Sequence, residues 1–369
     1  MCSLALSDEW LTSEYRRGVA PEPVTVGSRG IHPECPVFVI AELSGNHLGS
    51  LESALRIIDH AAAAGASAIK LQHYRPETIT VRSSLPEFAL ASGSIWDGRQ
   101  LFDLYAEAMT PWEWTEPLVE RSREHGLEWF SSPFDPTAVE FLEAFDPPAY
   151  KIASFELVDL PLIRLVAATG RPIVMSTGMA SLQEIDDAVE AARASGCSQL
   201  VLLRCNSAYP AEPSEMGLAS IELLRERYEC QVGLSDHTLD PTSAVVAVAL
   251  GATVIEKHLT ESRAKGGPDA AFSLEPEEFE GLVNNAEIAR QVRGSVRFGP
   301  TDREKSSLVF RRSLRAARNI SKGERITKEN VRSFRPAGGL PPGQFDEIKG
   351  RVLSRDVLAG EAIVQDVIE

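Results

Sequence analysis

The amino-acid sequence predicts an α/β fold, a (β/α)8 TIM barrel followed by a small C-terminal domain. Short apolar runs rich in β-branched residues alternate with longer Ala-, Leu- and Glu-rich stretches. Eight such units occupy roughly 225 residues, which is close to the length of a barrel of this kind. The competing fold is a doubly wound open sheet. It is disfavoured because the first predicted strand is not followed by a Gly-rich GxGxxG turn.

Eight runs are predicted to be strands because each is short, apolar and bounded by turn-forming residues. Their near-continuous apolar character is typical of parallel strands that are buried on both faces. They cover residues 37–42, 68–72, 128–133, 149–154, 172–177, 200–206, 231–236 and 253–258.

Seven helices are predicted between these strands. Good N-cap residues such as Ser50 and Ser181 precede several of them, and glycines such as Gly65 and Gly126 follow them. The helices cover residues 50–64, 111–125, 136–145, 160–169, 181–195, 214–228 and 240–250. The long interval between residues 72 and 128 departs from the period, and we expect it to form an excursion over the barrel mouth.

The alternation ends near Ser306, and short segments with two similar Gly-Glu turns, at 323–324 and 360–361, follow. This pattern predicts a compact, irregular β domain. The predicted organisation is an N-terminal extension with room for one hairpin (1–35), a catalytic barrel (36–297), a linker (298–306) and a small domain (307–369).

Composition limits the function classes. The net charge of −16 argues against nucleic acid as a partner. No apolar run approaches the ~20 residues that span a bilayer, so no membrane partner is expected. The five cysteines form no CxxC pair, and the N-terminus lacks a basic segment followed by an apolar one. These features predict a cytoplasmic protein.

Chemistry in such barrels lies at the C-terminal ends of the strands, and polar residues collect there in this sequence. Strand alternation places Lys70 and Gln72 on one face of their strand, and Glu256 and His258 on one face of theirs. The competing interpretation is that strand ends are polar because loops are polar. It weakens for the whole set, because buried Lys and His are costly without partners.

His237 and His258 end adjacent strands. Two imidazoles with a carboxylate such as Glu42 opposite suit a divalent first-row metal, for which Mn²⁺, Mg²⁺ and Zn²⁺ are all chemically possible. The alternative for either histidine alone is a hydrogen-bonded structural residue. A Ser-Asp-His triad at 235–237 is excluded, because neighbouring strand residues point to opposite faces.

Lys70 and Lys151 are expected to face each other across the barrel mouth. Four hydroxyls would lie near them, from Ser132, Ser154, Ser176 and Ser235. Two ammonium groups with several hydroxyls form a suitable cage for phosphate or carboxylate. The alternative is that one lysine is a Schiff-base nucleophile, as in a barrel aldolase.

The same residues lie within motifs that resemble the sialic acid synthase family in order and spacing. The motifs are AELSGNH (41–47), IKLQ (69–72), YKIASFE (150–156), STGM (176–179), SAYP (207–210), GLSDH (233–237) and GPD (267–269). The last segment of the chain resembles the antifreeze-like (β-clip) domain of that family, with Arg335 and Pro336 matching its motif. The resemblance covers residues 36–365.

Within the family, the pseudaminic acid synthase branch is the most similar. This likeness rests on GSIWDG (93–98), TPWEW (110–114) and SFE (154–156). The sequence departs from the branch at three positions: His73 stands where Thr is usual, Thr115 where His is common, and Asn206 where Thr is usual. The N-terminal extension is also longer than usual.

The resemblance implies an enzyme that condenses phosphoenolpyruvate with an acetamido-sugar aldehyde, with release of phosphate by C–O cleavage and formation of a nine-carbon 2-keto sugar acid. The implied acceptor is a 2,4-diacetamido-2,4,6-trideoxy-hexose, and N-acetylmannosamine or another sugar aldehyde is the alternative. A sugar-phosphate binding protein on a degraded barrel is a further alternative. It is disfavoured because both histidines and both lysines are present.

The resemblance also implies roles for individual residues. Glu42 would orient or deprotonate a water molecule, and His237 and His258 would hold Mn²⁺, with Mg²⁺ or Co²⁺ as alternatives. Phosphoenolpyruvate would be bound by Lys70, Lys151, Ser132, Ser154, Ser176, Ser207 and Ser235. The sugar would be bound by Gln72, Glu156, Tyr209, Asp269 and Arg335. Arg335 would complete the pocket of a partner in a domain-swapped homodimer.

Overall fold

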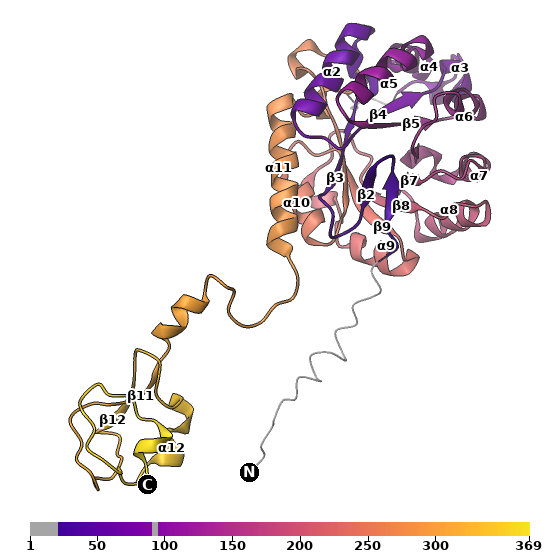
Figure 1. The fold of residues 1–369 in the computed structure, drawn as a ribbon. Coiled ribbons are helices and arrows are strands. Elements are labelled where there is room, and N and C mark those ends of the chain that lie inside the picture. Colours follow the sequence, from indigo (N-terminus) through magenta and orange to yellow (C-terminus); the bar gives the residue numbers. More distant parts are fainter. Residues whose placement is uncertain (1–20, 91–94) are drawn as a thin grey trace. The chain divides into compact units, whose positions relative to one another are not determined.

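A computed structural model describes residues 21–90 and 95–369 of the chain. The chain divides into two compact units, Met1–Gly294 and Ser295–Glu369. The first unit is a closed barrel of parallel strands surrounded by helices (Figure 1), so the predicted (β/α)8 fold is confirmed.

The barrel strands follow one another around the barrel in chain order, and β10 closes the ring by pairing with β3. All eight predicted strands are present. They are β3 (Phe38–Glu42), β4 (Ala68–His73), β5 (Glu128–Pro133), β6 (Tyr150–Ile152), β7 (Ile173–Ser176), β8 (Leu200–Cys205), β9 (Gln231–Asp236) and β10 (Val254–His258). Strand β6 ends earlier than predicted because a 3-10 turn, Ser154–Val158, follows it.

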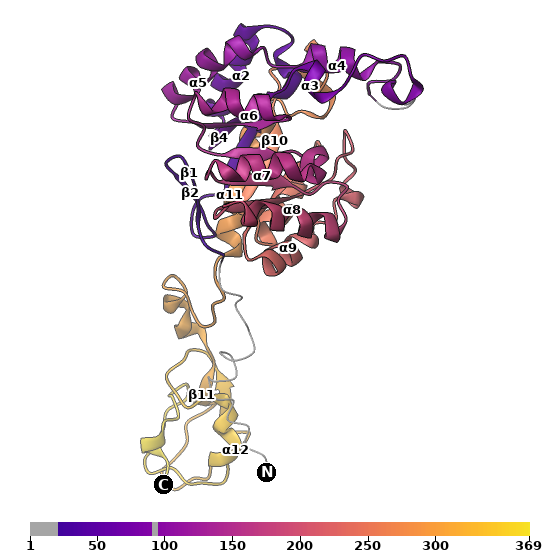
Figure 2. The same cartoon turned by 90° about the vertical axis from the view of Figure 1, so that its right-hand side faces the viewer.

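An outer ring of helices covers the barrel (Figure 2). The seven predicted helices are present as α2 (Leu51–Ala63), α5 (Thr115–Glu124), α6 (Pro136–Glu143), α7 (Leu160–Ala168), α8 (Leu182–Ala194), α9 (Ser220–Tyr228) and α10 (Thr242–Ala249). Helix α11 (Pro276–Arg293), which was not among them, packs against α10 and α2 and completes the ring. Side-chain N-caps fix the residue at which several helices begin. The Ser50 hydroxyl accepts from the Ser53 amide, and Ser181 and Glu184 form a capping box.

The predicted excursion between β4 and α5 contains two short helices, α3 (Pro76–Ile79) and α4 (Leu101–Ala108). Residues 93 and 94 of the GSIWDG motif, and residues 1–20 of the predicted N-terminal extension, lie outside the described part of the chain. Within the described ranges, no helix combines the length and the apolar character that a membrane crossing requires.

The described part of the N-terminal extension forms the expected hairpin, in which β1 (Val24–Val26) pairs antiparallel with β2 (Arg29–Ile31). Its buried Val24, Val26 and Ile31 join an apolar cluster with the residues that begin the barrel strands, such as Phe38. The Gln231 side-chain amide donates to the carbonyl of Pro21 at 2.9 Å. The hairpin therefore closes the end of the barrel opposite to the C-terminal ends of the strands.

The second unit has its own core. Strands β11 (Ser313–Ala316) and β12 (Val331–Phe334) pair antiparallel, and a short helix, α12 (Phe345–Ile348), follows them. Buried apolar side chains from along the unit pack together, among them Leu314, Ile320, Val331, Leu353 and Ile363. This architecture agrees with the predicted compact β domain.

Because the hairpin side chains fill the closed end of the barrel, we expect Ile31→Ala to lower the free energy of unfolding by about 3 kcal/mol. Urea denaturation followed by tryptophan fluorescence measures this change. Thr25→Ala, on the exposed face of the same hairpin, is the matched control and should leave stability unchanged. Equal stabilities for the two variants would show that the hairpin contributes no core packing.

Candidate active site

A cavity of about 510 Å³ opens at the C-terminal ends of the barrel strands. It brings together most of the site residues predicted from the sequence. Those lining it are Lys70, Gln72, Lys151, Ser154, Glu156, Ser176, Tyr209, Ser235, His237, His258 and Asp269. Arg335 belongs to the second unit, so the cavity as described is formed by the barrel unit alone.

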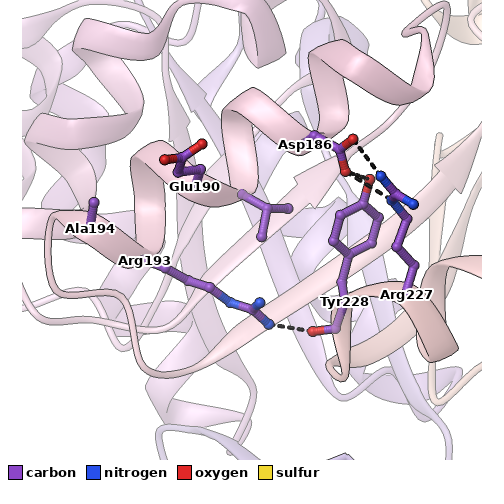
Figure 3. Close-up of a pocket in the computed structure, with 7 residues that line it drawn as sticks. Asp186, Glu190, Arg193, Ala194, Arg227 and Tyr228 are labelled. Atoms are coloured by element: carbon purple, nitrogen blue, oxygen red, sulfur yellow. Dashed lines mark hydrogen bonds and ion pairs between the residues drawn. The ribbon is translucent and has the colours of Figure 1, made fainter.

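A second cavity, of about 490 Å³, lies on the outside of the barrel between α8 and α9 (Figure 3). It lies at the surface, and its ion pair between Asp186 and Arg227 is open to solvent. The Asp186 carboxylate is 2.6 Å from Arg227 Nη2 and accepts from the Tyr228 hydroxyl at 2.8 Å, while Arg193 donates to the Tyr228 carbonyl. The barrel mouth, where buried ionisable groups converge, is therefore the candidate active site.

Four buried charged residues lie together at the barrel mouth, and we call them the lysine cage: Lys70, Lys151, Glu42 and Glu256. Lys70, Lys151 and Glu256 line the floor of the cavity, whereas Glu42 is outside the lining and pairs with Lys70. Lys70 Nζ is 2.7 Å from Glu42 Oε2 and 3.1 Å from Glu256 Oε1. Lys151 Nζ is 3.7 Å from the same Glu256 oxygen. Strands β3, β4, β6 and β10 supply these residues, so the cage depends on the closed barrel.

Burial and charge act against each other in the cage. Burial lowers the pKa of Lys70 to about 8, although Glu256 opposes the change. Burial would raise the pKa of Glu256, but Lys151 and Lys70 outweigh it and hold that pKa at about 2. Glu256 is therefore ionised at neutral pH and holds the two ammonium groups together.

Two of the predicted serine hydroxyls contact residues of the lysine cage. Ser176 Oγ accepts from Lys151 Nζ at 2.7 Å, and Ser235 Oγ donates to Glu256 Oε1 at 3.1 Å. Ser132 Oγ is buried and has no hydrogen-bond partner among the described residues. Ser132 is not among the residues that line the cavity.

Ser154 and Ser207 lie on either side of Gly178, in the loop after β7. The Gly178 amide donates to Ser154 Oγ at 3.1 Å. A Cβ atom at Gly178 would come within 2.3 Å of Ser207 Oγ and 2.6 Å of Ser154 Oγ. A side chain at position 178 would therefore clash with both hydroxyls, and of the two serines only Ser154 lines the cavity.

The imidazoles of His237 and His258 lie side by side, with ring centroids 5.3 Å apart. His237 Nδ1 contacts the Asn206 carbonyl at 2.8 Å, which fixes its ring orientation. His258 Nδ1 is buried without a hydrogen-bond partner among the described residues. Burial lowers the pKa of His258 well below its usual value, so this imidazole stays neutral, the form that binds metals.

The histidine pair suits a metal that takes its remaining ligands from water and substrate. The described residues contain no cluster of three or more His, Cys, Asp or Glu side chains placed to hold a metal. Glu42 instead pairs with Lys70. The expected carboxylate opposite the histidines is therefore engaged in the cage.

Two of the predicted sugar-binding residues, Gln72 and Asp269, are linked through Ser44. Gln72 Nε2 donates to Glu42 Oε1 at 3.1 Å and to Ser44 Oγ at 3.2 Å. Ser44 Oγ in turn donates to Asp269 Oδ2. Burial raises the pKa of Glu156 to about 7, and its Oε2 has no hydrogen-bond partner among the described residues. Glu156 is thus able to exchange a proton near neutral pH.

The sequence prediction assigned no role to several residues of the site. Glu256 shares a face with His258 by strand alternation, so the sequence carried a signal for it, but its partners only appear in the closed barrel. Ser44 and Cys205 also line the cavity. Burial would raise the pKa of Cys205, but the hydrogen bond and charge of His237, 3.9 Å away, lower it to about 7.

The residues that depart from the usual pattern of the branch either lie outside the cavity lining or contact the site only through a main-chain atom. His73 contacts Ser131 Oγ at 2.7 Å and Thr115 Oγ1 at 2.8 Å, so the two exchanged residues are hydrogen-bonded to each other. Neither His73 nor Thr115 lines the cavity. Asn206 contacts His237 through its main-chain carbonyl, which any residue supplies. These departures therefore do not alter the cavity wall.

Comparison with known proteins identifies close relatives. A model of the NeuB family matches residues 57–297, and a model of the SAF domain matches residues 311–369. The pseudaminic acid synthase of Campylobacter jejuni is 42% identical over 329 residues, which cover 89% of this chain and 96% of the relative. That of Helicobacter pylori is 38% identical over 336 residues, covering 90% and 98%.

Solved structures show the same fold. The N-acetylneuraminic acid synthetase of Leptospira borgpetersenii, in complex with citrate, has a TM-score of 0.71 and 32% identity, covering 79% of this chain and 96% of that one. The spore coat polysaccharide biosynthesis protein SpsE of Bacillus subtilis has a TM-score of 0.64 and 30% identity, covering 94% and 99%.

The buried His73 predicts a pH dependence of stability. Burial lowers its pKa from 6.5 to about 3 in the folded protein. Its stabilisation is complete above pH 6.5 and is lost as the pH falls toward 3, because only the unfolded state then binds the proton. Between pH 7 and 5.5, wild type should lose about 1 kcal/mol more unfolding free energy than His73→Gln in urea titrations. Parallel pH profiles would contradict this.

Proposed function

Because this chain belongs to the NeuB family, we propose that it is a phosphoenolpyruvate-dependent sugar-acid synthase. The reaction joins phosphoenolpyruvate to an acetamido-sugar aldehyde and releases phosphate and a nine-carbon 2-keto sugar acid. The Campylobacter and Helicobacter relatives are pseudaminic acid synthases, which supports an acceptor of that type, 2,4-diacetamido-2,4,6-trideoxy-hexose.

The lysine cage is the observation that carries the proposal. Lys70 and Lys151 are both buried on the cavity floor, where a small anion would meet two ammonium groups shielded from water. Hydroxyls of Ser132, Ser154, Ser176, Ser207 and Ser235 add neutral donors around them. Charge-assisted hydrogen bonds to phosphate and carboxylate are the strongest of their kind, so this floor suits phosphoenolpyruvate.

His237 and His258 would hold a divalent metal, for which we propose Mn²⁺, with Mg²⁺ and Co²⁺ as the ions to compare. His258 Nδ1, which is buried and has no hydrogen-bond partner in the described part of the chain, and the neutral state of the ring support this assignment. A bound ion would supply Lewis-acid polarisation of a carbonyl oxygen. The imidazoles themselves orient the site and leave room for water and substrate.

The proposed chemistry has three steps. C3 of phosphoenolpyruvate forms a bond to C1 of the aldehyde as the carbonyl π bond breaks, which leaves an alkoxide on C1 and positive charge at C2. Water then adds at C2 and gives a proton to Glu42, which lies 2.7 Å from Lys70 Nζ and passes that proton on to the C1 alkoxide to form the hydroxyl. The tetrahedral intermediate finally expels phosphate by cleavage of the bond between C2 and the bridging oxygen of the phosphate, and the proton of the C2 hydroxyl leaves with the phosphate as the 2-keto group forms.

The sugar would be held above the cage by Gln72, Glu156, Tyr209 and Asp269, all of which line the cavity. We further propose that Arg335 completes the pocket of a partner chain in a domain-swapped homodimer. A cytoplasmic location agrees with a substrate made in central metabolism.

The proposed reaction is tested by incubating the protein with Mn²⁺, bridge-labelled [¹⁸O]phosphoenolpyruvate and either 2,4-diacetamido-2,4,6-trideoxy-hexose or N-acetylmannosamine. We expect release of phosphate that carries the ¹⁸O, with faster release for the diacetamido sugar. Label retained in the sugar acid would contradict C–O cleavage. Trapping of substrate on Lys70 or Lys151 by borohydride would replace the proposal with a Schiff-base aldolase.

The metal assignment predicts that chelation lowers activity at least about tenfold and that Mn²⁺ restores it. Calorimetric titration of the chelated protein with Mn²⁺ should give binding that His258→Ala abolishes. His60→Ala, on the outer helix α2, is the matched control and should bind as wild type. Full activity after chelation, or unchanged Mn²⁺ binding by His258→Ala, would remove the metal from the proposal.

A further inference from the structure

The cavity changes character from its floor to its rim. Lys70, Gln72 and Tyr74 alternate along β4 and the residue after it, so they face the cavity at successive levels about 6.6 Å apart. Residues of the lysine cage line the floor. Beyond Tyr74, the wall is supplied by the excursion that contains α3 and α4, and we call the described residues 76–90 and 95–108 the rim segment.

The rim segment presents an aliphatic wall to the cavity. Its four members come from α3, from α4 and from the chain between them: Ile79, Leu90, Leu101 and Leu104. Leu104 is buried and the others are half-buried. These side chains offer no hydrogen-bond donor or acceptor, in contrast to the residues of the floor.

Trp96 fastens the rim segment across the barrel mouth. Its indole N–H donates to the Pro268 carbonyl at 2.7 Å, in the loop after β10. Its ring lies 5.7 Å from that of Tyr209, after β8, and 6.4 Å from that of Phe272. The aliphatic wall is thus anchored to two other strand loops and has a defined place over the cavity.

Polar groups line other parts of the cavity. Glu156 and Asp269 are among them, and the Tyr105 and Tyr74 phenols lie near enough that these carboxylates raise their pKa values in addition to burial. Amide and hydroxyl groups of an acceptor that face these residues would find partners. A hydroxyl that faces the four aliphatic side chains would not.

The proposed reaction fixes how the acceptor sugar lies between the charged floor and the aliphatic wall. Its C1 must meet phosphoenolpyruvate at the floor, so the opposite end of the carbon chain, C6, must point toward the rim. We infer that the aliphatic wall of the rim segment, with Leu104 and Ile79 as its core, determines acceptor specificity by selecting a C6 methyl over a C6 hydroxymethyl. This inference rests on the proposed function.

The physical basis is the free-energy cost of burying a hydroxyl that has no hydrogen-bond partner. A C6 hydroxyl would lose its hydrogen bonds to water and gain none from aliphatic side chains, whereas a methyl group loses nothing and gains packing. Differences of one such group in an apolar pocket are worth roughly 10- to 200-fold in kcat/KM. Leu104 and Ile79 are specificity-determining residues in this view, without a part in bond making.

The test compares 2,4-diacetamido-2,4,6-trideoxy-hexose with its 6-hydroxy analogue at saturating phosphoenolpyruvate. Wild type should prefer the 6-deoxy sugar by at least about tenfold in kcat/KM. Leu104→Ser and Ile79→Ser should each reduce that preference about tenfold, with the KM for phosphoenolpyruvate unchanged. Leu85→Ser, an exposed position of the same segment, is the matched control and should keep the wild-type preference.

Two variants guard against misfolding, since Ile79 is only half-buried and its replacement is expected to fold if that of Leu104 does not. A wild type without preference, or Leu104→Ser and Ile79→Ser variants that keep it, would overturn the inference alone. A wild type that releases no phosphate with either sugar would overturn the proposed function, and the inference with it.

Discussion

The pairing of two buried lysines with two buried glutamates is the constraint on which the rest of the site depends. An ammonium group inside an apolar barrel is costly unless a carboxylate accompanies it. Glu42 and Glu256 come from β3 and β10, the strands whose pairing closes the barrel. Each lysine of the cage lies within ion-pair distance of a glutamate, which is how the buried site tolerates the ammonium groups.

The pairing of β10 with β3, which closes the barrel, also fixes the histidine pair relative to the cage. His258 is paired in register with Glu42, and Glu256 lies two residues earlier on the same face of β10. A shift of one residue in this pairing would turn Glu256 and His258 toward the helices and bring Lys257 inward. Lys257 in fact lies on the outer face, 2.8 Å from Asp236, so the alternating residues of β10 serve two separate ion-pair networks.

The two ends of the barrel are built from different kinds of residue. The N-terminal hairpin fills one end with Val24, Val26 and Ile31, so that end contributes packing. The other end has a charged floor, other polar lining residues and an aliphatic rim. His73 of β4 and Thr115 of α5, which both depart from the usual family residues, are hydrogen-bonded to each other. Their exchange therefore concerns the contact between that strand and that helix. The acceptor choice that we propose is assigned to the rim segment, because neither His73 nor Thr115 lines the cavity.

The architecture can be read from the periodicity of the sequence, and most of the cavity lining from the strand ends and the family motifs. Short apolar runs at regular intervals predict the strands, and the polar residues that end them predict the cavity lining, including Lys70, Lys151 and His258. Only the tertiary structure decided the partners. The bridging role of Glu256, the unpartnered hydroxyl of Ser132 and the packing of α11 depend on contacts between segments far apart in the chain. So does the aliphatic wall, since no periodic signal in the excursion shows which of its leucines meet the cavity. A pattern along one strand shows which face a side chain occupies, but only the closed barrel sets the ångström-scale distances that decide which groups bind one another.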